Sequence, residues 1–185
     1  MAIVVGIMGL IGSGKDEAAD YMVKKYGFHK IALGDVVREY TKKDGLELNR
    51  INLQKTQKKY RDRYGKLFFS DKVIEKVKEE GWEKSIIAAI RVSQETKSIK
   101  KAFGKDIKII IVEASPKIRF ERLKKRKSDR DPKTFEEFQV QERNESKYFD
   151  YENTFKLADI KITNNGTRRE FYKKIDDLMK NIRFV

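Results

Sequence analysis

The sequence predicts a three-layer α/β domain in which a five-stranded parallel sheet carries helices on both faces. Short apolar segments, typical of buried strands, alternate along the 185 residues with longer segments of helical periodicity. A glycine-rich turn joins the first apolar segment directly to a helix. Strands separated by helices pair in parallel, which places helices on both sides of the sheet.

The composition indicates one globular domain over residues 1–185. Hydrophobic residues make up 39% of the chain, and 11 Phe and 8 Tyr supply aromatic surface that disordered chains lack. The absence of cysteine excludes disulfides and thiolate metal sites. The single histidine, His29, cannot build a zinc site or a Ser-His-Asp triad alone.

The apolar residues near the start of the chain do not predict a membrane segment or a signal peptide. Residues 2–11 are too few to span a bilayer, and they lack a preceding basic region and a following cleavage site. Together with the lack of cysteine, this predicts a cytoplasmic protein that has no membrane partner.

The expected strands are residues 2–8, 29–33, 85–90, 107–112 and 160–163. The expected helices in the first half are residues 16–26, 36–43, 52–64 and 71–80, the last two ended by Gly65 and Gly81. Residues 34–80, between the second and third strands, are expected to form a helical insertion that binds a phosphoryl acceptor.

Three helices are expected in the second half. Pro116 opens one at its first turn, where a missing N–H costs nothing. Asp131 precedes Pro132 and is expected to cap the next helix. Thr167 and Glu170 form a capping-box pair before the last helix.

A phosphate-binding loop lies between the first strand and the first helix. Its spacing, G-x-x-x-x-G-K, is that of a P-loop, and strand and helix flank it as the motif requires. Glycines let successive N–H groups face an anion, the helix N-terminus adds its dipole, and the lysine reaches the β- and γ-phosphates. The expected ATP-binding residues of this segment are Gly9, Leu10, Ile11, Gly12, Ser13, Gly14, Lys15, Asp16 and Glu17.

Asp16 departs from the usual P-loop. A Ser or Thr that binds magnesium normally follows the lysine, and here a carboxylate stands in its place. A carboxylate can hold Mg²⁺ directly or through water, so Asp16 is the expected metal ligand.

Residues 12–21 are similar to the S-G-K-D-x-x-A-D stretch of phage deoxynucleoside monophosphate kinases, and P-loop phosphomevalonate kinases also carry G-K-D. Almost the whole chain resembles archaeal kinases described as dephospho-CoA-kinase-like or adenylate-kinase-related. The matching segments are residues 34–38, 52–65, 90–91, 114–122 and 158–167. The resemblance implies an ATP- and Mg²⁺-dependent kinase of the P-loop fold.

Asp35 and Arg38 follow the second strand, at the sheet edge where α/β proteins bind ligands. Arg38 suits an acceptor phosphate. The resemblance to dephospho-CoA kinases implies that Asp35 takes a proton from an acceptor hydroxyl. Asp35 is also placed to cap the following helix, and the two roles are compatible.

Arg91 follows the third strand and is a second candidate for binding the acceptor, although a plain surface charge would also explain it. The similar archaeal kinases read Asp-Gly-Ile-Arg here, whereas this chain reads Ala88-Ala89-Ile90-Arg91. The sequence therefore lacks one acid that such kinases offer to magnesium or the acceptor.

Arginines after Pro116 indicate a mobile lid over residues 126–133. Arg119, Arg122 and Arg126 share one helix face by their spacing, and Arg130 follows in a loop. In nucleotide kinases such a lid stabilises the charge of phosphoryl transfer, so Arg122, Arg126 and Arg130 are expected to be catalytic. A solvated basic face is the alternative.

Asn165 and Gly166 end the last strand, and the resemblance to dephospho-CoA kinases implies that this loop touches the adenine. A tight turn would explain the Asn-Gly pair equally well.

The leading function is transfer of a phosphoryl group from ATP to a small phosphorylated acceptor such as a nucleoside monophosphate or a dephospho-CoA-like nucleotide. Another phosphorylated alcohol, such as a mevalonate phosphate, is an alternative acceptor. A nucleotide-binding regulator or a nucleic-acid-associated NTPase would use the net charge of +14. However, no nucleic-acid-binding module is recognisable, and a pure scaffold would leave Lys15 unexplained.

Overall fold

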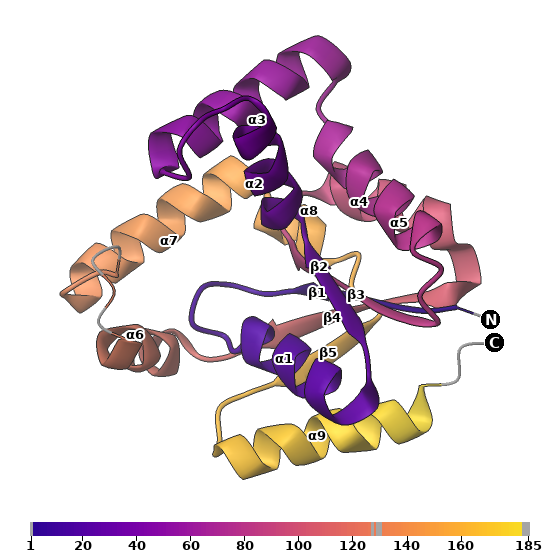
Figure 1. Ribbon diagram of the computed structural model, residues 1–185. Helices are drawn as coiled ribbons and strands as arrows, with labels where there is room; N and C mark the ends of the chain where they lie inside the picture. Colours follow the sequence, from indigo (N-terminus) through magenta and orange to yellow (C-terminus); the bar gives the residue numbers. More distant parts are fainter. Residues whose placement is uncertain (1, 127, 129–130, 183–185) are drawn as a thin grey trace.

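The sheet forms the middle layer of the molecule in a computed structural model that describes residues 2–126, 128 and 131–182 (Figure 1). Its strands are β1 (Ile3–Met8), β2 (His29–Ala32), β3 (Lys84–Ile90), β4 (Ile107–Glu113) and β5 (Ile160–Thr163). They lie in the order β2-β3-β1-β4-β5, and every neighbouring pair is parallel. The predicted five-stranded parallel sheet is confirmed.

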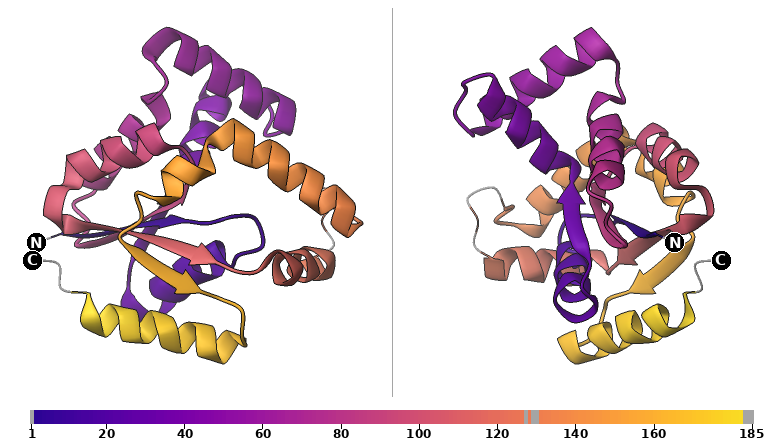
Figure 2. Two further views of the ribbon diagram at one scale, coloured as in Figure 1. Left: turned by 180° about the vertical axis from the view of Figure 1, so that it is seen from behind. Right: turned by 45° about the vertical axis from the view of Figure 1, so that its right-hand side comes forward.

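Helices cover both faces of this sheet (Figures 1 and 2). Helices α1 and α9 pack on one face, and α2, α4, α5 and α8 pack on the other. No helix in the described part of the chain is long and apolar enough to cross a membrane. The helices are α1 (Lys15–Tyr26), α2 (Leu33–Lys43), α3 (Arg50–Tyr64), α4 (Phe68–Glu79), α5 (Ser93–Phe103), α6 (Pro116–Arg126), α7 (Phe135–Phe149), α8 (Tyr151–Phe155) and α9 (Arg168–Asn181), with a 3₁₀ turn at Gly104–Asp106.

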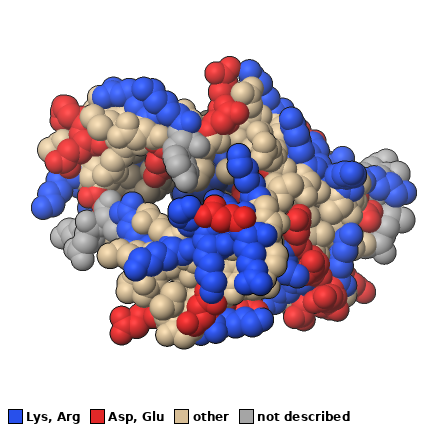
Figure 3. Space-filling model, turned by 90° about the horizontal axis from the view of Figure 1, so that it is seen from above, with Lys and Arg blue, Asp and Glu red and all other residues tan. Residues whose placement is uncertain are grey.

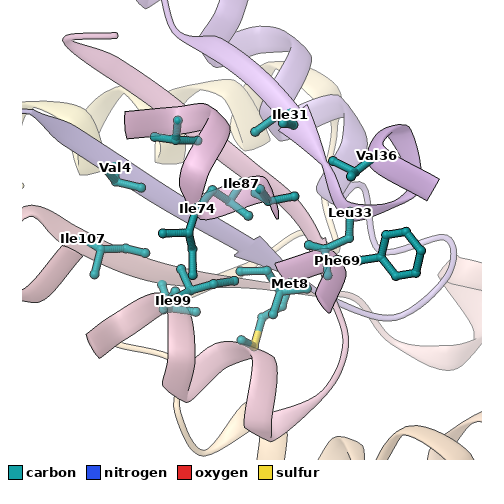
Figure 4. Packing of buried hydrophobic residues seen from close by; sticks show 14 of the residues in the cluster. Val4, Met8, Ile31, Leu33, Val36, Phe69, Ile74, Ile87, Ile99 and Ile107 are labelled. Carbon is teal, nitrogen blue, oxygen red and sulfur yellow. The ribbon is translucent and has the colours of Figure 1, made fainter. Parts of the chain in front are cut away.

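Alternation along the central strands builds a hydrophobic core on each face of the sheet. Val4 and Met8 of β1 point into the core under α2, α4 and α5, which Figure 4 shows from close by. Val5 and Ile7 of the same strand point into the core under α1 and α9. Both faces of the strand are buried, which explains why its sequence is continuously apolar.

Two helices lie where none was predicted. Helix α5 buries Glu95 and Thr96 together with the apolar Ile99, so its buried face carries too little hydrophobic pattern to be read from the sequence. Helix α8 has only five residues, which is too short for a helical period to show.

The expected start of α7 is wrong. Asp131 does not cap it, because its carboxylate accepts a hydrogen bond of 2.8 Å from Nε of Arg126. The helix begins three residues after Pro132, at Phe135, where the Thr134 hydroxyl accepts from the Glu137 N–H. The cap expected at Thr167 is confirmed, since its hydroxyl accepts from the Glu170 N–H at the start of α9.

A bulge interrupts the pairing of β1 with β3 beside the phosphate loop. Ile7 pairs with Ala88 and Met8 with Ile90, which leaves Ala89 without a partner in this ladder. Ala89 has a φ of 61°, in the left-handed region that favours glycine. An L residue there costs roughly 1–2 kcal/mol. The end of β3 is therefore strained directly before Arg91.

We expect Ala89→Gly to raise the free energy of unfolding by about 0.5–1 kcal/mol, because glycine adopts this φ without strain. Denaturant unfolding checks this. Ala88→Gly is the matched control, and we expect it to destabilise the protein because Ala88 lies buried in regular strand. Equal destabilisation by both substitutions would contradict the strain at residue 89.

Candidate functional site

The loop between β1 and α1 has a backbone that only glycine allows at three positions. Gly9, Gly12 and Gly14 have φ values of 151°, 77° and 97°. A Cβ on Gly12 would lie 2.7 Å from the Arg119 carbonyl oxygen, and one on Gly14 would collide with the amide of Asn164. Conformation and space thus both require the glycines of the predicted phosphate loop.

Two side chains from distant segments hold this loop in place. Arg122 of α6 donates from Nη1 to the carbonyl oxygens of Gly12 and Ser13, at 3.3 and 3.2 Å, and from Nη2 to the Asn164 side chain at 3.1 Å. Asn164, directly after β5, donates from Nδ2 to the Ser13 carbonyl at 2.8 Å. The Ser13 N–H donates to the Leu10 carbonyl at 3.2 Å. Other N–H groups of the loop and of the start of α1 are the groups that a P-loop uses to bind an anion.

The structure places Arg122 on α6, against the phosphate loop. The hydrogen bonds described for its guanidinium go to that loop and to Asn164, and its expected catalytic role stays a prediction. Burial lowers its pKa, an effect that Glu17 opposes. Arg122 is a brace of the loop in this conformation.

Two other braces were missed in the sequence. Asn164 follows Ile160 and Ile162 on the same side of β5, and this alternation could have revealed that it points inward. Arg119 is only 2% exposed, donates from Nε to the Ala114 carbonyl at 3.0 Å and pairs with Glu142 of α7. No sequence pattern distinguishes this buried arginine from its exposed neighbours on α6.

Lys15 lies at the start of α1 with its side chain only 11% exposed. Burial lowers the pKa of Lys15, nearby Arg91 lowers it further, and Asp16 and Glu145 oppose the shift. The Ser13 hydroxyl is buried in the same loop without a hydrogen-bond partner among the described residues. Buried polar groups normally have a hydrogen-bond partner, so this hydroxyl is a feature expected of a loop that binds a ligand.

Asp16 offers a carboxylate that fits magnesium. Its side chain is 67% exposed, and its Oδ2 lies 3.5 Å from Nζ of Lys15. Within the described residues, no group of three or more His, Cys, Asp or Glu could hold a metal alone. A magnesium ion at Asp16 would thus depend on phosphate oxygens and water for its other ligands, as is common for this ion.

Asp35 and Arg38 lie together in the first turns of α2. The Asp35 carboxylate accepts from the Ala32 N–H at 3.0 Å and from Nη1 of Arg38 at 2.7 Å. The expected cap at Asp35 is wrong in its position, because α2 starts at Leu33 with Ala32 as its N-cap. Asp35 lies within the first turn of the helix and binds the Ala32 N–H from there. Both side chains are about half exposed.

Arg91 connects the phosphate loop to the helices above the sheet. Its charge influences Lys15, and its guanidinium lies over the Phe149 ring at 5.4 Å. On α5, the nearby Glu95 is buried and pairs with Arg61 of α3 at 3.3 Å. Burial raises the pKa of Glu95, against the effect of both arginines. Seen from above, the surface of the molecule has a hollow that Lys and Arg side chains border (Figure 3).

Only part of the expected lid can be placed. Arg126 is half exposed and pairs with Asp131, and this hydrogen bond raises its pKa. Asp16 contributes to the same shift, which places Arg126 within electrostatic reach of the phosphate loop. Arg130 lies outside the described residues.

The expected adenine loop is tied down by its neighbours. Asn165 accepts from the Ser115 N–H through Oδ1 at 2.8 Å, and at Gly166 a Cβ would collide with the Glu170 carboxylate. Glu17 is held by Arg168 and by the Tyr172 hydroxyl of α9. Asn165 also lines a cavity of about 320 Å³, together with Leu10 of the phosphate loop and Arg119 of α6.

We expect Asn164→Ala to lower the free energy of unfolding by about 1–3 kcal/mol, because a buried amide that holds the loop and Arg122 is lost. We expect Asn165→Ala, at the neighbouring exposed position, to cost less than about 0.5 kcal/mol. Thermal and denaturant unfolding measure both. Equal effects would refute the assignment of Asn164 as the brace.

The comparisons with known proteins agree with this architecture. A family model described as an AAA domain matches residues 8–139. A UPF0200 protein of Thermococcus kodakarensis is 33% identical over 183 residues, covering 97% of this chain and 98% of its own. Another UPF0200 protein, from Thermococcus gammatolerans, is 34% identical over 184 residues, covering 97% of this chain and 95% of its own.

Solved structures show the same fold at low sequence identity. The protein TT1252 of Thermus thermophilus has a TM-score of 0.65 at 17% identity, covering 98% of both chains. A shikimate kinase of Bacteroides thetaiotaomicron has a TM-score of 0.59 at 15% identity, covering 96% of this chain and 97% of its own. The fold is that of P-loop kinases, and the chain belongs to the UPF0200 proteins and to the AAA domain family.

Proposed function

We propose that this protein is an ATP-dependent phosphotransferase that acts on a small phosphorylated acceptor. The observation that carries the proposal is the braced phosphate loop, whose Lys15 lies within electrostatic reach of Arg91 at the end of β3. Lys15 thus serves the donor phosphates, and Arg91 is available for an anionic acceptor. Cytoplasmic location and a nucleotide as partner follow from this function as expectations.

ATP binds with its β- and γ-phosphates at residues 9–15. The N–H groups of the loop and the dipole of α1 stabilise the phosphates, and Lys15 neutralises charge on the γ-phosphate. Because Lys15 is largely buried, its charge is less screened by water than that of a surface lysine. The adenosine part of ATP would contact Asn165, Gly166 and Glu17.

Magnesium would be held by Asp16 together with phosphate oxygens. The ion supplies charge neutralisation at the transferring phosphoryl group when it is bound. The exposed carboxylate of Asp16 supports this assignment.

The acceptor binds between Arg38 and Arg91. A guanidinium offers paired N–H donors that match the oxygens of a phosphate. Asp35 supports Arg38 through their ion pair, and Arg126 approaches the donor side near Asp16. Positioning and charge neutralisation supply most of the rate in such transfers. The acceptors that fit are nucleoside monophosphates, dephospho-CoA-like nucleotides and phosphorylated alcohols such as mevalonate phosphates.

We expect ADP release from Mg·ATP with at least one acceptor of these three groups, and we expect Lys15→Ala to lower the rate at least about 100-fold. Lys24→Ala, which removes an exposed charge from the other end of α1, is the matched control and keeps the rate. A coupled ADP assay across ribo- and deoxynucleoside monophosphates, dephospho-CoA and mevalonate phosphates measures this.

Lack of turnover across that panel, with ATP still bound, would refute the kinase. A nucleotide-binding regulator would then be the better assignment. Steep salt dependence of binding to generic RNA or DNA would point instead to a nucleic-acid-associated NTPase.

A further inference from the structure

The space between Lys15 and Arg91 is where phosphoryl transfer would take place under the proposed function. The end of β3 contributes no acid there, because Ala88 and Ala89 precede Ile90 and Arg91. A carboxylate reaches this region from a different part of the chain. Glu145 of α7 is one of the groups whose charge influences Lys15.

Contacts place Glu145 against the phosphate loop. It lines a narrow cavity together with Leu10 and Ile11 of that loop and with Tyr151. The Tyr151 hydroxyl donates to Oε2 of Glu145 at 3.3 Å, and within the described residues this is the only side-chain hydrogen bond found for that carboxylate. Glu145 is half-buried, so its carboxylate is only partly solvated.

The junction of α7 and α8 holds Glu145 in this place. Tyr151 is buried, and its ring stacks on Phe155 at 5.1 Å. The Thr154 hydroxyl lies 3.4 Å from the Arg91 carbonyl, and the Arg91 guanidinium lies over Phe149. Because these residues of the junction contact Arg91, the junction holds Glu145 and Arg91 in a fixed relation to each other.

The other acids near the cleft are already engaged. Asp35 uses one oxygen for the Ala32 N–H and the other for Arg38. Glu95 pairs with Arg61, and Glu142 pairs with the buried Arg119. Asp16 pairs with Lys15 and is the candidate for magnesium. Among these acids of the described residues, Glu145 is the one whose partner is a tyrosine hydroxyl and not a cation.

We propose that Glu145 is the general base of this site and that the acceptor offers it a hydroxyl group, so that the substrate is a phosphorylated alcohol. This inference rests on the proposed phosphotransferase function and selects among its acceptors. The hydroxyl oxygen forms a bond to the γ-phosphorus while the bond from that phosphorus to the β–γ bridging oxygen breaks. ADP leaves with the electron pair of that bond, and the hydroxyl proton passes to Glu145.

The carboxylate also selects against the other class of acceptor. A phosphate oxygen that attacks in a nucleoside monophosphate carries negative charge and needs no base. Glu145 would repel such an oxygen, whereas it would accept a hydrogen bond from a hydroxyl. Arg91 would then bind the phosphate that the alcohol carries elsewhere.

The test compares Glu145→Gln with wild type on the same acceptors, with products identified by ³¹P NMR. Every acceptor of this panel carries both a hydroxyl and a phosphate group, so the position of the new phosphoryl group in the product shows which of the two attacked. We expect wild type to phosphorylate a hydroxyl acceptor and Glu145→Gln to lower kcat at least about 100-fold, with the KM for ATP unchanged. Glu136→Gln, at an exposed position of the same helix, is the matched control and keeps the wild-type rate.

A structural role of Glu145 would give a different result. It would lower the melting temperature, and Tyr151→Phe, which removes the hydrogen bond to the carboxylate, would reproduce the whole loss. A Glu145→Gln rate within about threefold of wild type, or transfer by wild type to phosphate oxygens alone, would overturn the inference and leave the kinase intact. Absence of transfer by wild type to every acceptor would refute the proposed function, and the inference with it.

Discussion

The hydrogen bonds that Arg122 and Asn164 make to the Ser13 carbonyl are the contacts on which the site depends. They join three segments far apart in the sequence, namely the turn after β1, helix α6 and the end of β5. A glycine-rich turn is flexible in isolation, and ordering it costs conformational entropy. These braces come from the protein's own side chains, so they offset part of the entropy cost of ordering the loop.

Charge is arranged around this braced loop in an order that suits phosphoryl transfer. The largely buried Lys15 lies in this loop beside the exposed Asp16, and Arg91, whose charge influences Lys15, is the proposed contact for the acceptor. The bulge at Ala89 stores strain immediately before Arg91, and strain of this kind is often found at functional sites. Glu145 enters from α7, so the proposed base belongs to the helix that follows the expected lid.

Much of the fold was predictable because its signals are local. Continuous apolar strands, a glycine-rich turn and capping residues such as Thr167 each act within a few residues, and the sheet and the phosphate loop follow from them. Helix α5 was missed because it buries polar residues. Asp131 was expected to be a cap because it precedes Pro132, but its carboxylate pairs with Arg126, five residues earlier. The roles of Arg122, Asn164 and Glu145 depend on contacts between distant segments, which residue type and spacing do not encode.

The most direct measurement is calorimetric titration of the protein with the Mg²⁺ complex of a non-hydrolysable ATP analogue. The braced loop predicts saturable binding of one analogue per chain with a dissociation constant below about 1 mM, the range in which enzymes bind their substrates. It also predicts that ADP competes for the same site. Absence of saturable binding, or equal binding by a Lys15→Ala variant, would contradict the assignment of residues 9–16 as the site for the nucleotide phosphates.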